Sequence, residues 1–193
     1  MRIYLYLAAL LLSSPAGATP IRVDTQKLIT DARQQIGVTV TYDPAYRRLT
    51  YPGGDVPGNT GVCSDVIVRA LRQQNIDLQQ LLHEDMKKNF PQYPQRWGLK
   101  KTDPNIDHRR VPNLMTFLTR TGNNIPTDLN PKNYHPGDIV TWNLTPAGFL
   151  PHIGIVSDRL TPDGTPFIIH NIGAGTREEP GLFQYPIIGH YRL

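Results

Sequence analysis

The helical and strand-like patterns of this 193-residue chain occupy different parts of the sequence. Apolar residues recur at helical spacing up to about residue 120, and short β-rich runs separated by Pro, Gly and Asp follow. Helices that precede strands in this way favour an α+β fold. We therefore predict N-terminal helices packed on a small antiparallel sheet.

The expected elements follow from periodicity and from the residues that begin and end helices. Asp77 suits the start of a helix, and Gly37 and Gly122 suit positions just after one. Eighteen prolines predict long ordered loops between the elements. The predicted helices span 24–36, 63–74, 77–90 and 112–120, and the predicted strands span 139–142, 152–157, 167–170 and 187–192.

The first 18 residues have the pattern of an export signal. Arg2 precedes an apolar stretch over 3–12, and small residues follow up to Ala18. We expect cleavage after Ala18, which leaves residues 19–193 as a single domain in the periplasm. No later segment approaches the roughly 20 apolar residues that a membrane-spanning helix requires, so no membrane span is expected.

The charge of the chain excludes some classes of partner. The formal net charge is +4, and the basic doublets have no interleaved aromatic runs. This pattern, together with export, argues against a nucleic-acid partner. A basic face toward an anionic polymer such as the cell wall stays open. No cofactor or metal is called for, and a monomer is expected.

Cys63 is the only cysteine, so no disulfide can form within one molecule. It lies where a Gly-containing loop meets the predicted helix 63–74. The positive end of a helix lowers a thiol pKa, and the thiolate is the nucleophilic form. A lone cysteine also occurs as a small buried hydrophobe. An unpaired thiol at this junction of an exported chain favours the catalytic interpretation.

Two histidines on predicted strands supply candidate partners for the thiol. His152 is the expected general base, because histidine is the usual partner of a thiol nucleophile. His170 or the adjacent Asn171 is a candidate for the residue that orients the base. Strand alternation places only one of these two on the cleft face, and we predict His170.

Five short motifs occur in an order that resembles the NlpC-type branch of the papain-like cysteine peptidases. The motifs are Tyr51-Pro52-Gly53-Gly54, Val62-Cys63-Ser64, Gly137-Asp138-Ile139-Val140, His152-Ile153-Gly154-Ile155-Val156 and Ile168-Ile169-His170. The stretches 61–71, 83–86 and 107–114 further resemble an uncharacterised bacterial family of YijF-like proteins, which is placed in the same superfamily. The resemblance covers most of the chain after the signal.

The resemblance implies a papain-like fold and a cysteine hydrolase with a Cys63 nucleophile, a His152 base and an orienting His170. Tyr51 would border the site. The branch typically cleaves amide bonds in peptides of the bacterial cell wall, so peptidoglycan or another peptide is the expected substrate. The reaction would pass through a thioester acyl-enzyme that water hydrolyses.

The chain departs from the branch at two positions near the cysteine. Val62 stands where wall endopeptidases usually have an Asp that binds a free amine, and Asp65 stands where a Gly is usual. The second departure adds a carboxylate that opposes a nearby thiolate. The predicted substrate-binding residues are Tyr51, Ser64, Asp65, His108 and Arg109.

His108 and Arg109 have two interpretations. They could line the cleft, where a guanidinium fork would clamp a substrate carboxylate. They could equally belong to a solvated segment that leads into the helix beginning near Pro112.

Two alternatives use the same residues differently. Cys63, His152 and His170 could bind zinc, with water as the fourth ligand, but no closely spaced ligand pair supports this site. The chain could also be a non-catalytic periplasmic module that binds the wall or a partner on the same fold. The intact set of one thiol and two imidazoles favours the hydrolase.

Overall fold

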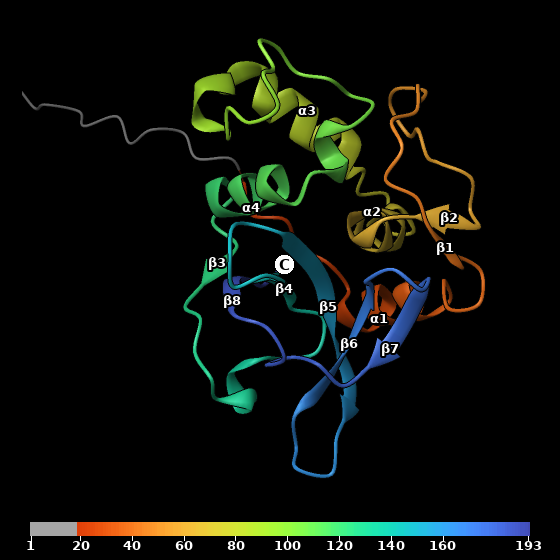
Figure 1. Cartoon of the computed structure of the whole chain (residues 1–193), viewed down its shortest axis with the longest axis vertical. Coiled ribbons are helices and arrows are strands. Elements are labelled where there is room, and N and C mark those ends of the chain that lie inside the picture. Colours follow the sequence, from red (N-terminus) through yellow and green to blue (C-terminus); the bar gives the residue numbers. More distant parts are fainter. Residues whose placement is uncertain (1–18) are drawn as a thin grey trace, which may run out of the picture.

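The computed structural model describes residues 19–193, so the expected signal peptide lies outside the described residues. Four α-helices precede most of a six-stranded sheet (Figure 1). The helices are α1 (Thr25–Arg33), α2 (Cys63–Arg72), α3 (Leu78–Lys88) and α4 (Val111–Arg120). Three short 3-10 helices are η1 (Phe90–Gln92), η2 (Asp107–Arg109) and η3 (Pro131–Asn133).

The large sheet is antiparallel throughout and has the order β3-β8-β4-β5-β6-β7. Its strands are β3 (Asn124–Ile125), β4 (Ile139–Asn143), β5 (Pro151–Leu160), β6 (Pro166–Asn171), β7 (Thr176–Glu179) and β8 (Ile187–Tyr191). A separate parallel pair joins β1 (Thr41–Tyr42) to β2 (Thr60–Gly61), directly before α2. The predicted α+β class with an antiparallel sheet is confirmed.

Side-chain caps set where two of the helices begin. Asp24 precedes α1 and accepts a hydrogen bond from the Lys27 N–H, and Asp77 precedes α3 and accepts one from the Gln79 N–H. Each cap satisfies an amide that has no acceptor within its own helix. Because Asp77 was predicted to start a helix, its cap is a feature that the sequence revealed.

Strand alternation divides the buried residues between the two faces of the sheet. Ile153 and Ile155 of β5 belong to the larger core, together with apolar residues of all four helices. Val156 of β5 belongs to a smaller core with Trp142 of β4 and Leu182 of the loop before β8. The helices therefore cover one face, and long loops cover the other.

The structure differs from the prediction mainly at short or polar elements. Helix α1 ends at Arg33 instead of 36, and β1, β2, β3 and β7 were not predicted. The two-residue strands β2 and β3 are too short for an alternation pattern, and β7 reads Thr-Arg-Glu-Glu. Its place at the edge of the sheet explains this charged composition.

The described part of the chain contains no helix with the length and apolar character needed to cross a membrane.

Candidate active site

Cys63 is the first residue of α2 and is only 4% exposed. It borders a cavity of about 400 Å³ between the loop after β1, the segment before α4 and the start of β5. The lining residues are Tyr42, Pro44, Tyr46, Val62, Cys63, Trp97, Ile106, Arg109, Arg110, Val111, Pro112 and Pro151. The thiol thus lies at a helix N-terminus and at a ligand-sized cavity.

Burial raises the pKa of the Cys63 thiol to about 11. Hydrogen bonds from the backbone N–H groups of Ile153 and Ser64 and from the Tyr42 hydroxyl lower this pKa, and the Asp65 carboxylate raises it. The lowered thiol pKa expected from the helix N-terminus is therefore corrected. Loss of water around the sulfur outweighs the helix dipole, so the resting group is a neutral thiol.

The two predicted histidines meet on neighbouring strands. Nε2 of His152 on β5 lies 2.8 Å from Nδ1 of His170 on β6. Nε2 of His170 lies 3.0 Å from a carboxylate oxygen of Glu179 on β7. Burial lowers the pKa of His152 to about 3 and also lowers the pKa of His170, so both rings are neutral at neutral pH.

The residues on either side of His152 lie near the thiol, whereas His152 and His170 are not among the residues that line the cavity. The N–H of Ile153 donates a hydrogen bond to the Cys63 sulfur, and Ile153 directly follows His152. Pro151, on the other side of His152, lines the same cavity as Cys63. Since His152 uses Nε2 toward His170, its Nδ1 is the ring nitrogen left to accept a proton from another group.

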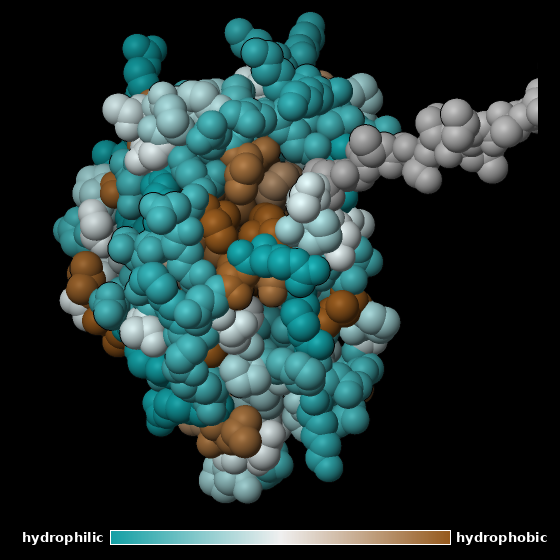
Figure 2. All heavy atoms as spheres, turned by 180° about the vertical axis from the view of Figure 1, so that it is seen from behind, coloured by the Kyte–Doolittle hydropathy of each residue, from teal (hydrophilic) through white to brown (hydrophobic). Residues whose placement is uncertain are grey.

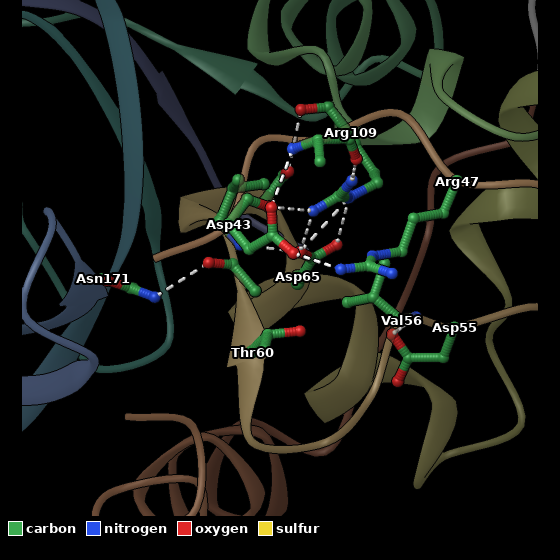
Figure 3. A network of polar contacts seen from close by, with 12 residues as sticks. Asp43, Arg47, Asp55, Val56, Thr60, Asp65, Arg109 and Asn171 are labelled. Atoms are coloured by element: carbon green, nitrogen blue, oxygen red, sulfur yellow. Dashed lines mark hydrogen bonds and ion pairs between the residues drawn. The ribbon is translucent and has the colours of Figure 1, made fainter. Parts of the chain in front are cut away.

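His170, and not Asn171, contacts His152. The Asn171 side chain is fully buried, and its amide donates to the carbonyl oxygen of Gly61 at 3.2 Å (Figure 3). This bond ties the end of β6 to the strand that leads into α2. Asn171 therefore holds the helix start near the sheet, while His170 faces the base.

Three of the predicted substrate-binding residues, Ser64, Asp65 and Arg109, form a buried hydrogen-bond network around the start of α2, which we call the bracket. The Asp65 carboxylate accepts from the Val62 N–H at 2.7 Å and from the Arg109 guanidinium at 3.0 Å (Figure 3). The Ser64 hydroxyl donates to the carbonyl oxygen of Arg109 at 2.9 Å. Arg109 also donates to the carbonyl oxygens of Asp43 and Ala45.

This bracket differs from the predicted substrate clamp. Arg109 borders the cavity, but its side chain and that of Asp65 are only 2% and 4% exposed, and its guanidinium is already paired with the Asp65 carboxylate. Ser64 is fully buried. The three residues instead hold the nucleophile helix, the loop after β1 and η2 in fixed positions.

Unlike Arg109, His108 and Tyr51 lie outside the cavity lining. His108 is 2% exposed, its Nδ1 has no hydrogen-bond partner, and burial lowers its pKa to about 4. Tyr51 is exposed and packs edge-on against His83, with ring centroids 5.0 Å apart. Neither side chain reaches the place that the sequence predicted for it.

Two residues at the site were missed by the sequence analysis. Tyr42 occupies the position that was expected for Tyr51, since it lines the cavity and hydrogen-bonds the thiol. Burial raises the pKa of Tyr42 well above its usual value. The run Val-Thr-Val-Thr-Tyr that ends at Tyr42 alternates as a strand does, which is the one signal that pointed to it. No sequence pattern pointed to Glu179, because it lies in a charged run without apolar alternation.

The zinc alternative finds no support in the geometry. Within residues 19–193, no three His, Cys, Asp or Glu side chains are grouped so that they could hold a metal ion.

A second cavity of about 410 Å³ lies beside the first described residues, on the face where Figure 2 shows an apolar hollow. Ile21, Ile76, Leu81 and Phe117 give it apolar walls. Its described lining includes no thiol and no imidazole. The cavity at Cys63 is therefore the better candidate for chemistry.

Comparisons with known proteins agree with the YijF-like resemblance. Residues 29–193 match the family described as "Domain of unknown function (DUF1287)". The chain is 58% identical over 179 residues to the uncharacterized protein YijF of Escherichia coli (strain K12), covering 92% of this chain and 86% of that protein.

A solved structure of a protein similar to lipoprotein, of the NLP/P60 family, from Staphylococcus aureus subsp. aureus Mu50 matches with a TM-score of 0.43 and 13% identity. The match covers 94% of this chain and 45% of that one, so the chain spans less than half of the solved protein. On the sequence match over most of its length, the chain belongs to the DUF1287 family.

Proposed function

We propose that this chain is an exported, periplasmic, papain-like cysteine hydrolase that cleaves an amide bond in cell-wall peptides. Cys63 is the nucleophile, His152 the general base and His170 the residue that orients the base. The observation that carries the proposal is the thiol at the mouth of a ligand-sized cavity, next to a strand whose histidine is hydrogen-bonded to a second one.

The proposed reaction starts from a neutral thiol and a neutral imidazole. The sulfur attacks the carbonyl carbon while its proton passes to Nδ1 of His152. His152 then protonates the leaving amine, and a thioester to Cys63 results. Water, deprotonated by His152, hydrolyses this thioester and restores the thiol. Both rings and the thiol end in their starting protonation states.

Backbone and hydroxyl donors around the sulfur stabilise the negative charges that form during the proposed reaction. The Cys63 N–H, in the first turn of α2, has no acceptor within the helix and can stabilise the oxyanion of the tetrahedral intermediate. The Tyr42 hydroxyl and the Ile153 N–H stabilise negative charge on the sulfur. These bonds offset part of the cost that burial places on the thiolate.

The cavity suits a peptide that carries a carboxylate. Tyr42, Tyr46 and Trp97 offer aromatic surface, and the Arg110 guanidinium lies 4.2 Å from the centroid of the Trp97 ring. Arg110 has one ion pair, to Asp107 at 3.4 Å, which is long for a charge-assisted bond. A substrate carboxylate can therefore compete for this guanidinium, in the role first expected for Arg109.

The first test incubates the purified protein, without residues 1–18, with intact peptidoglycan and identifies released fragments by mass spectrometry. We expect fragments from the wild type and none from Cys63→Ala, which removes only the sulfur. His152→Gln should likewise release none.

Equal release by wild type and Cys63→Ala would exclude the thiol mechanism. If the wild type and Cys63→Ala both bind the wall and neither releases fragments, the non-catalytic binding module replaces the hydrolase.

A further inference from the structure

A carboxylate extends the pair of histidines by one more group. Glu179 on β7 lies diagonally across from His170, since the cross-strand partner of Glu179 is Ile168 and that of His170 is Arg177. Its Oε1 is 3.0 Å from His170 Nε2. The Glu179 side chain is 36% exposed, whereas that of His170 is 9% exposed. The order of groups from the protein edge inward is carboxylate, imidazole, imidazole.

The chemistry of these groups permits only one arrangement of protons. A carboxylate offers lone pairs alone, so His170 Nε2 must carry the hydrogen of that bond. A neutral ring has one N–H, which leaves a bare Nδ1 on His170 to accept from His152 Nε2. His152 then has its hydrogen on Nε2, and its Nδ1 is a free lone pair.

This arrangement is the one that the proposed base requires. Were both rings reversed, His170 Nδ1–H would donate to His152 Nε2, and His152 Nδ1 would already hold a hydrogen. A ring in that state cannot take the thiol proton. The two arrangements differ only in the direction in which the hydrogen bonds between His152, His170 and Glu179 run. The group that bonds His170 Nε2 decides which direction is adopted.

We propose that Glu179 is a positioning residue that selects the tautomers of His170 and His152 and so leaves Nδ1 of His152 free to act as a base. The role of that base rests on the proposed hydrolase, whereas the tautomers themselves do not. When the thiol proton moves to His152 Nδ1, the His152 Nε2–H still donates to His170. No proton passes to Glu179, and its negative charge faces the new imidazolium through one intervening ring.

The near-isosteric variant Glu179→Gln tests this role. A Gln side chain can accept a hydrogen bond from His170 Nε2 or donate one to it. The variant therefore keeps a hydrogen bond but no longer forces the hydrogen onto His170 Nε2. In the wild type, two-bond ¹H–¹⁵N correlation spectra of the mature protein should show the Nε2–H tautomer for both rings. Signals are assigned by their loss in His152→Gln and His170→Gln.

In Glu179→Gln we expect Nδ1–H signals at His170 and His152. We also expect a 10- to 100-fold lower rate of wall-fragment release, which is about the effect of removing a partner that orients a histidine. Arg177→Ala, an exposed neighbour on β7, is the matched control and should leave the tautomers unchanged.

Spectra of Glu179→Gln identical to those of the wild type would overturn the proposal, as would an Nδ1–H tautomer of His152 in the wild type. Because the spectra need no substrate, they decide the role of Glu179 even if peptidoglycan is not cleaved.

Discussion

The protonation of Cys63 decides how the thiol can react. Its pKa of about 11 and the His152 pKa of about 3 lie on opposite sides of neutral pH. A preformed thiolate and imidazolium pair is therefore not the resting state. In the proposed mechanism, the nucleophile therefore has to form as the substrate binds, by transfer of the proton to His152.

Alkylation of Cys63 should reflect this raised pKa. Only the thiolate reacts with iodoacetamide, so the rate constant should rise about tenfold per pH unit between pH 7 and 10 and level off near pH 11. The measurement is the loss of free thiol over time across this pH range. A plateau already reached at pH 7 would contradict the neutral resting thiol.

Tyr42→Phe supplies a matched variant for this experiment. The Tyr42 hydroxyl lowers the thiol pKa through its hydrogen bond, so its removal should move the alkylation profile to higher pH. Tyr46→Phe also changes a cavity tyrosine, but Tyr46 hydrogen-bonds Asp103, so its profile should match that of the wild type.

His108 should make the protein sensitive to acid. Burial lowers its pKa from 6.5 to about 4, and nearby Asp65 and Asp77 oppose this shift while Arg72 and Arg109 assist it. Between these pH values the unfolded state binds the proton and the folded state does not, so the free energy of unfolding falls as pH falls. The loss attributable to His108 is roughly 3 kcal/mol by pH 4.

Urea unfolding at pH 7 and at pH 4.5 checks this contribution. His108→Gln removes the titrating group, so the variant should lose less stability between the two pH values than the wild type. The other histidines are the same in both proteins, so their contributions cancel in the comparison. Equal losses in the two proteins would show that His108 does not carry the effect.

At the scale of elements, the distance between β5 and β6 determines where His170 lies. Gly154 permits this approach, because a Cβ at that position would stand 2.8 Å from Cγ2 of Ile168 and 3.1 Å from Cβ of His170. Real side chains do not pack so closely, so a larger residue would force the strands apart.

Gly154→Ala should lower the free energy of unfolding by about 1–3 kcal/mol, which is typical of overpacking. It should also weaken the contact between His152 and His170, so wall-fragment release should fall further than stability alone explains. Gly58→Ala is the control, because its added Cβ meets nothing within 4 Å. Full activity in folded Gly154→Ala would show that the strand spacing is not critical.

Elements with strong internal patterns were predictable, and elements defined by their neighbours were not. Helices α2 and α3 and strands β4, β5, β6 and β8 carry their own apolar periodicity and were expected near their observed positions. Strand β7 exists only because β6 offers hydrogen bonds to it. Its missing pattern is why Glu179 escaped the sequence analysis.

At the scale of the whole molecule, Asn123 joins both ends of the described chain. Its amide accepts from the Ile21 N–H at 3.2 Å and donates to the carbonyl oxygens of Ile21 at 3.1 Å and Arg192 at 2.8 Å. The residue is 4% exposed. It therefore fastens the segment before α1 and the segment after β8 to the end of α4.

Asn123→Ala should lower the free energy of unfolding by roughly 2–4 kcal/mol, because it leaves buried backbone groups without partners. Hydrogen exchange should become faster at the Ile21 amide, which loses its acceptor. The Arg192 amide should change less, since it donates to the Asn123 backbone carbonyl, which the variant retains. Asn124→Ala, an exposed neighbour, should leave stability and exchange nearly unchanged.

The sequence by itself determined the fold class, the main helices and strands, and the three residues proposed for catalysis. Periodicity is a local property, and a single cysteine at a helix start beside strand histidines is visible without coordinates.

Only the tertiary structure decided which groups surround them. Arg109 pairs with Asp65, Tyr42 and not Tyr51 reaches the thiol, and Glu179 meets His170. These contacts join residues that are far apart in sequence or that lie on an edge strand without a pattern. The raised thiol pKa belongs here too, because desolvation depends on everything packed around the sulfur.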